Sequence, residues 1–152
     1  MGGLVTKDFN IRPLEQQDGE QWQFIWGEYL RFYETKLPPE IYSETFSRLT
    51  DSNNTVQNCL VAHTGETLHG LVHYIFHADN WKSTDVCYLQ DLFVLREMRQ
   101  KGIAKALIQA VYEAADTNGT SSVYWMTQEF NQKARKLYDQ VASLTPFIIY
   151  ER

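Results

Sequence analysis

Long apolar runs are absent from the 152-residue sequence, and no segment approaches the roughly 18 residues of a membrane-spanning helix. No basic stretch followed by an apolar block opens the chain, which argues against a secretory signal. Residues 1–6 match the N-myristoylation pattern at Gly2, but so short a pattern recurs by chance. Lysines and arginines number 14 against 19 aspartates and glutamates, and this net charge of −5 disfavours nucleic-acid binding. We therefore expect a soluble, cytoplasmic protein that binds neither membranes nor nucleic acid.

Cysteines and clusters of metal-ligating residues are also scarce. Cys59 and Cys87 lie in apolar segments, so they are expected to be buried free thiols of a reducing compartment. His73 and His77 share one strand face with His69, but no carboxylate stands at a metal-ligand spacing. No metal site is therefore expected.

What is present divides into short regular segments separated by turn residues. Apolar residues at helical spacing predict helices, such as the stripe from Trp22 to Tyr33 that follows the potential cap Asp18. The expected order is strand 9–12, helices 18–33 and 40–50, strands 58–63, 68–77 and 86–95, helix 102–116, strand 122–127, helix 131–141 and strand 147–150. Because no linker or repeat interrupts this order, residues 1–152 are expected to form a single domain.

The segment 88–116 carries the strongest functional pattern. An apolar strand leads through a basic loop with one glycine, Gly102, directly into a helix. The first turn of a helix has backbone N–H groups without internal partners and the positive end of the helix dipole, which together favour phosphate oxygens. Gly102 lets the backbone approach such a ligand, and Arg99, Lys101 and Lys105 add positive charge. The sequence thus predicts a phosphate-binding loop.

Two motifs resemble the GNAT N-acetyltransferases. Arg99-x-x-Gly102-x-Ala104 resembles the acetyl-CoA signature of that family, and Asn131 through Tyr138 resembles its Asn-x-x-Ala-x-x-x-Tyr pattern. The similarity extends to the order of elements and is greatest to small members that acetylate polyamines and histone tails. It implies an α/β (α+β) GNAT fold, in which a mixed, mostly antiparallel central sheet is flanked by helices on both faces and splayed at its central strands.

The resemblance also implies acetyl-CoA as co-substrate and a role for each matching residue. In the family, the loop amides hold the CoA pyrophosphate, the central strand receives the acetyl arm, the asparagine bonds the CoA arm, and the tyrosine protonates the sulfur as general acid. Carried over, the loop residues are Arg99, Gln100, Lys101, Gly102, Ile103, Ala104 and Lys105, the strand residues are Leu92, Phe93 and Val94, and the last two are Asn131 and Tyr138. A helix cap at Asn131 and a core tyrosine at Tyr138 are the alternatives.

Amide formation from an ammonium ion also needs a base, because an alkylammonium group has a pKa near ~10.4. The central strand breaks its apolar pattern at Gln90 and Asp91, which indicates either a bulge or a functional face. Polyamine-acetylating relatives have a glutamate where Gln90 stands, so we expect the base to be Asp91, or a water that Asp91 orders. In the alternative interpretation, Asp91 only accepts hydrogen bonds from a neighbouring helix.

The acceptor amine is expected to meet carboxylates and aromatic faces. Glu28 lies off the apolar stripe of the first helix and is the first candidate for substrate binding, with Gln90 beside the base as the second. The expected acceptors, in order, are polyamines or other small amines, lysine side chains of proteins such as histone tails, and amino acids. A CoA-binding regulatory module without turnover is the alternative function, whereas a dinucleotide-binding domain is disfavoured because its Gly-x-Gly-x-x-Gly loop is missing.

The C-terminal segment departs from the family pattern. GNAT proteins usually have two strands after the last helix, but only about ten residues follow Ala142 here, enough for one strand at 146–150. A sheet that ends on one short strand has an incomplete edge, and such edges pair with other chains. We therefore expect a homodimer, or a dimer of dimers, in which the C-terminal strand pairs or exchanges with a partner.

Overall fold

The computed structural model describes residues 8–120 and 122–152, so the N-myristoylation pattern at residues 1–6 lies outside the described part. Five strands form one sheet in the order β1-β2-β3-β4-β5. They are β1 (Asn10–Pro13), β2 (Gln57–Thr64), β3 (Thr67–His77), β4 (Val86–Val94) and β5 (Val123–Tyr124). The helices are α1 (Gly19–Phe32), α2 (Pro39–Thr50), α3 (Ile103–Thr117) and α4 (Gln132–Val141), with short 3-10 turns at η1 (Gln16–Asp18) and η2 (Arg96–Met98). Within the described residues, no helix has the length and apolar character needed to cross a membrane.

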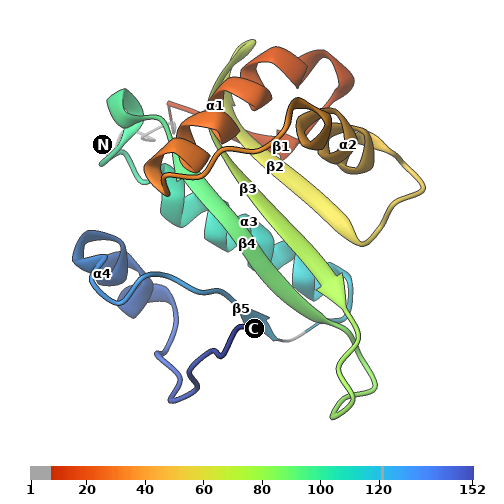
Figure 1. Cartoon of the computed structure of the whole chain (residues 1–152), viewed down its shortest axis with the longest axis vertical. Helices are drawn as coiled ribbons and strands as arrows, with labels where there is room; N and C mark the ends of the chain where they lie inside the picture. Colours follow the sequence, from red (N-terminus) through yellow and green to blue (C-terminus); the bar gives the residue numbers. More distant parts are fainter. Residues whose placement is uncertain (1–7, 121) are drawn as a thin grey trace, which may run out of the picture.

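The predicted fold class is confirmed, because helices cover both faces of a mixed sheet (Figure 1). On one face, the apolar stripe of α1 packs with α2 and the sheet, and Trp22 and Ile25 are fully buried there. On the other face, α3 buries Ile103, Leu107 and Val111 against the sheet. The two periodic stripes in the sequence therefore mark two separate cores, one on each side.

The central strands diverge, as expected for the predicted splay. Strands β1 to β4 are antiparallel, whereas β4 and β5 run parallel and pair only at Cys87 with Val123 and at Tyr88 with Tyr124. From Leu89 onward, β4 has no strand partner on that side among the described residues. The C-terminal half of β4 thus presents an open edge toward α4.

Strand β4 contains a bulge where the polar pair interrupts its apolar pattern. Asp91 pairs with His73 and Leu89 pairs with Tyr74, so Gln90 is an extra residue without a partner on β3. Gln90 is exposed, whereas Asp91 is buried. The prediction of a bulge at this position is confirmed.

The two cysteines are buried free thiols, as predicted, and burial raises the pKa of Cys87 to about 11.

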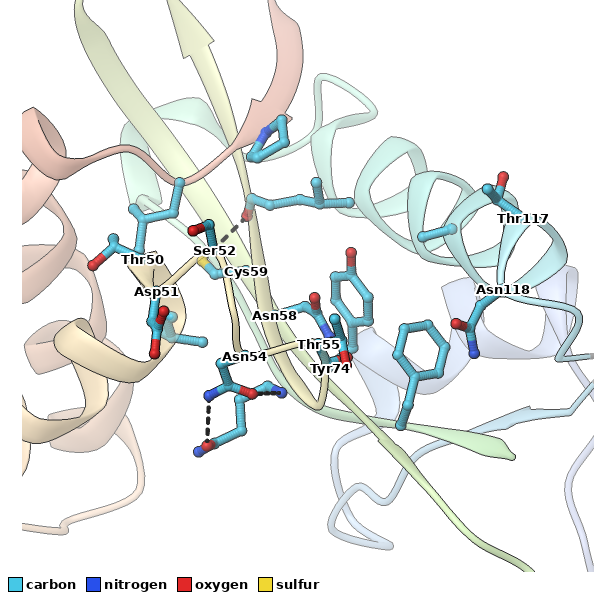
Figure 2. Close-up of a pocket in the computed structure, with 17 residues that line it drawn as sticks. Thr50, Asp51, Ser52, Asn54, Thr55, Asn58, Cys59, Tyr74, Thr117 and Asn118 are labelled. Carbon is cyan, nitrogen blue, oxygen red and sulfur yellow. Dashed lines mark hydrogen bonds between the residues drawn. The ribbon is translucent and has the colours of Figure 1, made fainter. Parts of the chain in front are cut away.

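The end of β2 around Cys59 lies beyond the residues that pair with β1. β1 pairs with β2 from His63 to Leu60 and ends at Pro13, which cannot donate to a further ladder bond. A cavity of about 600 Å³ adjoins this end of β2, between the α2–β2 loop and the end of α3 (Figure 2). It contains none of the predicted site residues.

Two expectations about the C-terminal third are wrong. The strand expected at 122–127 is limited to Val123 and Tyr124, and the segment 146–150 forms no strand. Its side chains lie in solvent instead, with Phe147 82% and Tyr150 90% exposed. β-branched and aromatic residues favour a strand only where a neighbouring strand can pair with it, and none is adjacent within the described chain.

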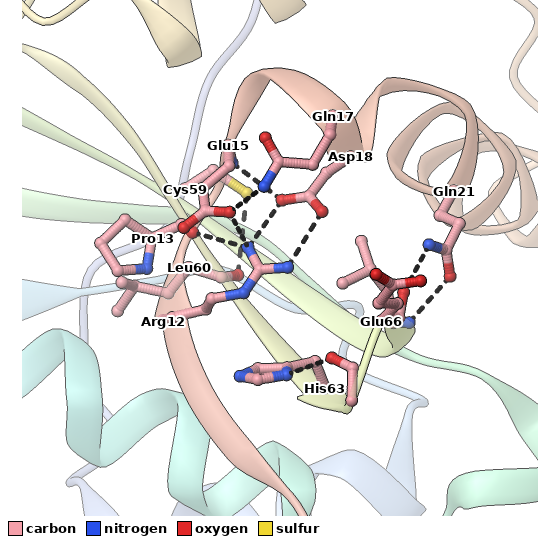
Figure 3. Close-up of polar contacts among 12 residues, drawn as sticks. Arg12, Pro13, Glu15, Gln17, Asp18, Gln21, Cys59, Leu60, His63 and Glu66 are labelled. Atoms are coloured by element: carbon pink, nitrogen blue, oxygen red, sulfur yellow. Dashed lines mark hydrogen bonds and ion pairs between the residues drawn. The ribbon is translucent and has the colours of Figure 1, made fainter.

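The start of α1 is held by a buried ion pair rather than by a side-chain cap. Asp18 is 3% exposed, and its two carboxylate oxygens accept hydrogen bonds from the Arg12 guanidinium at 2.7 and 3.0 Å (Figure 3). The Glu15 N–H donates to the same carboxylate at 2.8 Å. The expectation that the Asp18 side chain caps α1 is therefore wrong, because Arg12 and Glu15 occupy it. Burial alone would raise the pKa of Asp18, but these donors lower it.

We predict that Asp18→Asn destabilises the protein by ~2 kcal/mol at pH 7, because it breaks a buried charge-assisted pair. The ion pair stabilises the native state above the ordinary carboxyl pKa of 3.8 and loses this effect as the pH falls below it. Urea unfolding of wild type and variant should therefore differ much less at pH 3 than at pH 7. Glu44→Gln, at an exposed pair with Arg48, is the control and should change stability by less than ~0.5 kcal/mol. An equal difference at both pH values would contradict this account.

Candidate active site

The loop between β4 and α3 has the backbone geometry of an anion-binding turn. Gln100 and Gly102 both adopt left-handed conformations, with φ of 64° and 83°. Alternation of left- and right-handed residues turns successive N–H groups toward one concave surface. Helix α3 begins its ladder with the Ala106 N–H donating to the Gly102 carbonyl at 3.0 Å, and no side chain of the described chain caps its first turn. The loop can therefore bind an anion through backbone N–H groups.

The space beside Gly102 is open. A Cβ placed on Gly102 would meet no atom of the described chain within 4 Å, so a ligand can approach the backbone there. Arg99 anchors the loop to β4, since its Nε–H donates to the Val94 carbonyl at 3.0 Å and its guanidinium lies 5.2 Å from the centroid of the Phe93 ring. The predicted phosphate loop and the predicted strand residues thus adjoin each other.

Asp91 is the centre of a buried polar cluster. Its side chain is directed to the α1 face, where Oδ2 accepts a hydrogen bond from the indole N–H of Trp26 at 3.2 Å and lies 2.8 Å from Nδ1 of His73. The far nitrogen of His73, Nε2, accepts from the indole N–H of Trp22 at 3.0 Å. Asp91 is 7% exposed and, with Gln90 and His73, lines a cavity of about 260 Å³. It therefore receives a hydrogen bond from a helix and also borders a cavity.

Several phenols surround Asp91. Burial raises the pKa of Tyr29, Tyr33 and Tyr88, and the negative charge of Asp91 raises each further. The rings of Tyr29 and Tyr33 lie 4.9 Å apart. These hydroxyls stay protonated at neutral pH, so they surround the carboxylate with neutral donors rather than with competing charges.

Tyr138 lies on α4, with its ring edge-on to Trp125 at 5.5 Å between centroids. Burial, with a smaller effect of Tyr33, raises the pKa of Tyr138 to about 12. The phenol therefore carries its proton at neutral pH, as a general acid must.

Asn131 precedes α4, and its carbonyl accepts the first helical hydrogen bond, from Arg135 N–H at 3.0 Å. Its side chain caps nothing within the described chain; Nδ2 instead donates to Thr127 Oγ1 at 3.4 Å. The alternative that Asn131 is an ordinary side-chain cap is therefore wrong. The side-chain oxygen remains available for a ligand.

The model of the acetyltransferase (GNAT) family matches residues 20–142, which include the loop, the bulged strand and all of α4. The chain belongs to the GNAT acetyltransferase family. It is accordingly an acetyl-CoA-dependent N-acetyltransferase, as predicted.

This GNAT protein is 37% identical over 151 residues to the D-amino-acid N-acetyltransferase HPA3 of Saccharomyces cerevisiae, covering 98% of this chain and 93% of that protein. It is 23% identical over 135 residues to the thialysine N-epsilon-acetyltransferase of Caenorhabditis elegans, covering 89% of this chain and 82% of the relative. A solved structure of AAC(6')-Iy in complex with a bisubstrate analog superposes with a TM-score of 0.82 at 20% identity, covering 95% of this chain and 97% of the other. That similarity shows the shared fold.

The remaining site predictions fall around two cavities. Glu28 lines a cavity of about 730 Å³ between α1, the end of β4 and the start of α4, together with Phe93, Arg99 and Gln100. It is ion-paired with Arg31 at 2.9 Å. Gln90 lines the smaller cavity beside Asp91 instead. Among the described residues, no group of three or more histidine, cysteine, aspartate or glutamate side chains is arranged to hold a metal ion.

Sequence reasoning missed part of the cluster around Asp91. The residues missed are Trp22, Trp26, Tyr29, Tyr33 and His73. The aromatic ones share one helical stripe, which predicts a helix but no polar cluster, and the strand spacing of His73 argues only against a metal site. Their connection depends on the β3–β4 register that places His73 opposite Asp91. The consecutive polar residues Gln90 and Asp91 were the available signal in the sequence. A bulge at Gln90 changes the face of the sheet to which the Asp91 side chain points.

We predict that Gly102→Ala weakens acetyl-CoA binding at least ~10-fold, because a left-handed alanine is strained and its methyl group occupies the open side of the loop. Gly65→Ala is a matched control: Gly65 also has a left-handed φ, of 57°, with no atom within 4 Å of a built Cβ, but it lies in the β2–β3 turn. Both variants should lose ~1 kcal/mol of stability, and calorimetric titration with acetyl-CoA should show weaker binding in Gly102→Ala alone. Equal affinities would contradict the assignment of this loop.

Proposed function

We propose that this acetyltransferase moves the acetyl group of acetyl-CoA to the primary amine of a small molecule by direct attack in a ternary complex, with Asp91 as the base and Tyr138 as the acid. The observation that carries the proposal is the carboxylate of Asp91, which is buried on the strand that leads to the loop yet lines a cavity under α1 and α2. The loop residues 99–105 would hold the diphosphate, Leu92 to Val94 the acetyl arm, and Asn131 the CoA arm.

The chemistry assigns one proton transfer to each residue. An ammonium group entering the cavity beside Asp91 is stabilised by the carboxylate and by the aromatic side chains of Trp26 and Tyr74, which line the same cavity. Asp91 first takes one proton of the ammonium group, directly or through a water, because only the neutral amine has a lone pair that can attack the thioester carbon. The new bond to the thioester carbon makes the nitrogen acidic, and its second surplus proton passes to solvent. The C–S bond then breaks, and the leaving thiolate takes the proton of Tyr138. Solvent restores both residues.

The acceptor is proposed to be small. The cavity beside Asp91 measures about 260 Å³, which is below the usual size of a site for a drug-sized ligand. Relatives are named for D-amino acids and for thialysine, which supports a small amine over a protein tail. Amino acids, polyamines and lysine peptides are therefore the classes to compare, with Gln90 at the rim of the cavity and Glu28 as the more distant contact.

We predict that free thiol is released from acetyl-CoA in the presence of at least one small amine. Tyr138→Phe should lower kcat by ~10²-fold, since it removes a general acid, while acetyl-CoA affinity stays within ~3-fold. Tyr112→Phe is the control, because the Tyr112 hydroxyl donates to the Val141 carbonyl at 2.8 Å. Its removal shows how much kcat falls when α4 is held less firmly but Tyr138 is kept. Binding of acetyl-CoA without turnover on any amine would favour the regulatory alternative instead.

We also propose a homodimer in which the C-terminal segment 144–150 pairs with a second copy of this chain. Five large apolar side chains of this segment lie in solvent: Leu144, Phe147, Ile148, Ile149 and Tyr150. An exposed apolar group of this size is typical of an interface. The same chain offers the complementary feature, a short β5 beside an unpaired edge of β4, so reciprocal exchange would satisfy both copies with two-fold symmetry. A dimer of dimers would need a further surface.

We predict that light scattering after size-exclusion chromatography gives twice the chain mass for the wild type. Ile148→Asp combined with Ile149→Asp should give a monomer, because two charges cannot be buried in an apolar strand interface. The control carries the same two charges at exposed polar positions outside the segment, Gln140→Asp with Ser143→Asp, and should remain dimeric. A monomeric wild type would refute the dimer.

A further inference from the structure

The hydrogen bonds of His73 determine its protonation. An indole N–H can only donate, so the nitrogen of His73 that faces Trp22, Nε2, must be an acceptor without a proton. The ring is therefore neutral, and its proton is on Nδ1. Nδ1 lies 2.8 Å from Oδ2 of Asp91, so His73 donates to the carboxylate. The donor count thus assigns both the tautomer and the direction of each hydrogen bond.

The surroundings of His73 disfavour a doubly protonated ring. His73 is 4% exposed, and its ring packs edge-on to that of Trp26 at 5.5 Å between centroids. The rings of Trp22 and Trp26 lie 5.1 Å apart, and Phe46 closes the outer side of Trp22 at 5.3 Å. An imidazolium ion would bring an N–H group against the N–H of Trp22 inside an apolar core, so it is disfavoured.

Both donors to Asp91 reach the same oxygen. Trp26 and His73 each end on Oδ2, so neither of them occupies Oδ1, and the neutral Tyr29 hydroxyl is a further hydrogen-bonding neighbour of the carboxylate. The donors come from α1 and β3, two packed elements on either side of the carboxylate. Two hydrogen bonds to one oxygen orient the carboxylate plane, which leaves the other oxygen for a substrate proton.

We propose that His73 is a positioning residue for the acetyl transfer: Trp22 locks it as the neutral Nδ1–H tautomer, and it holds the Asp91 carboxylate with Oδ1 directed to the acceptor amine. This inference rests on the proposed role of Asp91 as base. His73 does not relay the proton, since its Nε2 is occupied by Trp22; the proton of the amine ends on Asp91.

Two nearly isosteric substitutions test the role. In His73→Asn, the side-chain Nδ2 takes the place of the imidazole Nδ1 and can still donate to Asp91, whereas in His73→Leu a methyl group stands there. Both variants leave Trp22 without its acceptor and open the same space, so they differ in the donor alone. We expect kcat of His73→Leu to be at least ~10-fold below that of His73→Asn, as for a misplaced general base, with the KM for acetyl-CoA within ~2-fold in both. Equal kcat values in the two variants would overturn the proposal.

The Asp91→Asn background separates this inference from the proposed function. If His73 acts through Asp91, the difference between the two His73 variants should disappear in that background. Wild-type turnover in Asp91→Asn would remove Asp91 as base and the role of His73 with it. Loss of turnover in Asp91→Asn, together with equal activity of His73→Asn and His73→Leu, would overturn the role of His73 alone.

The tautomer can be measured without any substitution. Protein labelled with ¹⁵N-histidine should show His73 with a protonated Nδ1 and an unprotonated Nε2 in long-range ¹H–¹⁵N spectra at neutral pH. A protonated Nε2 at His73 would overturn the lock even if the His73 variants failed to fold.

Discussion

The separation of β4 from β5 is the constraint on which the rest of this protein depends. Two residue pairs join these strands, and after Tyr88 no strand of the described chain lies along this edge of β4. The backbone at Leu92 to Val94 is therefore available to a ligand, and the loop that follows carries its left-handed residues to the same end of the strand. A continuous sheet would satisfy more hydrogen bonds but would leave no room for the proposed binding of the acetyl arm at this edge.

Buried carboxylates recur in this fold, and each is stabilised by identified donors. Asp18 is held by Arg12, which joins β1 to the start of α1. Asp91 is held by neutral donors alone, an indole and an imidazole. A charged partner would neutralise the carboxylate and compete with an incoming ammonium ion, whereas neutral donors stabilise the negative charge and leave it free to attract a cation. The difference matches a structural role for Asp18 and a chemical role for Asp91.

Apolar periodicity predicted α1 and α3 well, because each buries one face against a large sheet. The loop at Gly102 was predictable for a different reason: a glycine and basic residues at a strand–helix junction have few other uses. The segment 146–150 was not, since strand formation depends on a neighbour that the sequence does not reveal. The partners of Asp91 were also out of reach, because Trp22, Trp26 and His73 are brought together by the β3–β4 register and not by any spacing along the chain.

The bulge at Gln90 changes the face of the sheet on which the odd-numbered side chains of β4 lie. Before it, Cys87 and Leu89, both odd-numbered, belong to the core under α3; after it, Phe93 and Leu95, also odd-numbered, belong to the core under α1. In the two halves of β4, odd-numbered side chains therefore point to opposite faces of the sheet, and the unpaired Gln90 joins the halves. Asp91 is the first residue after the bulge. Regular alternation would place its carboxylate with Cys87 and Leu89 in the core under α3. Because of the bulge, the carboxylate instead faces the indoles of Trp22 and Trp26 under α1.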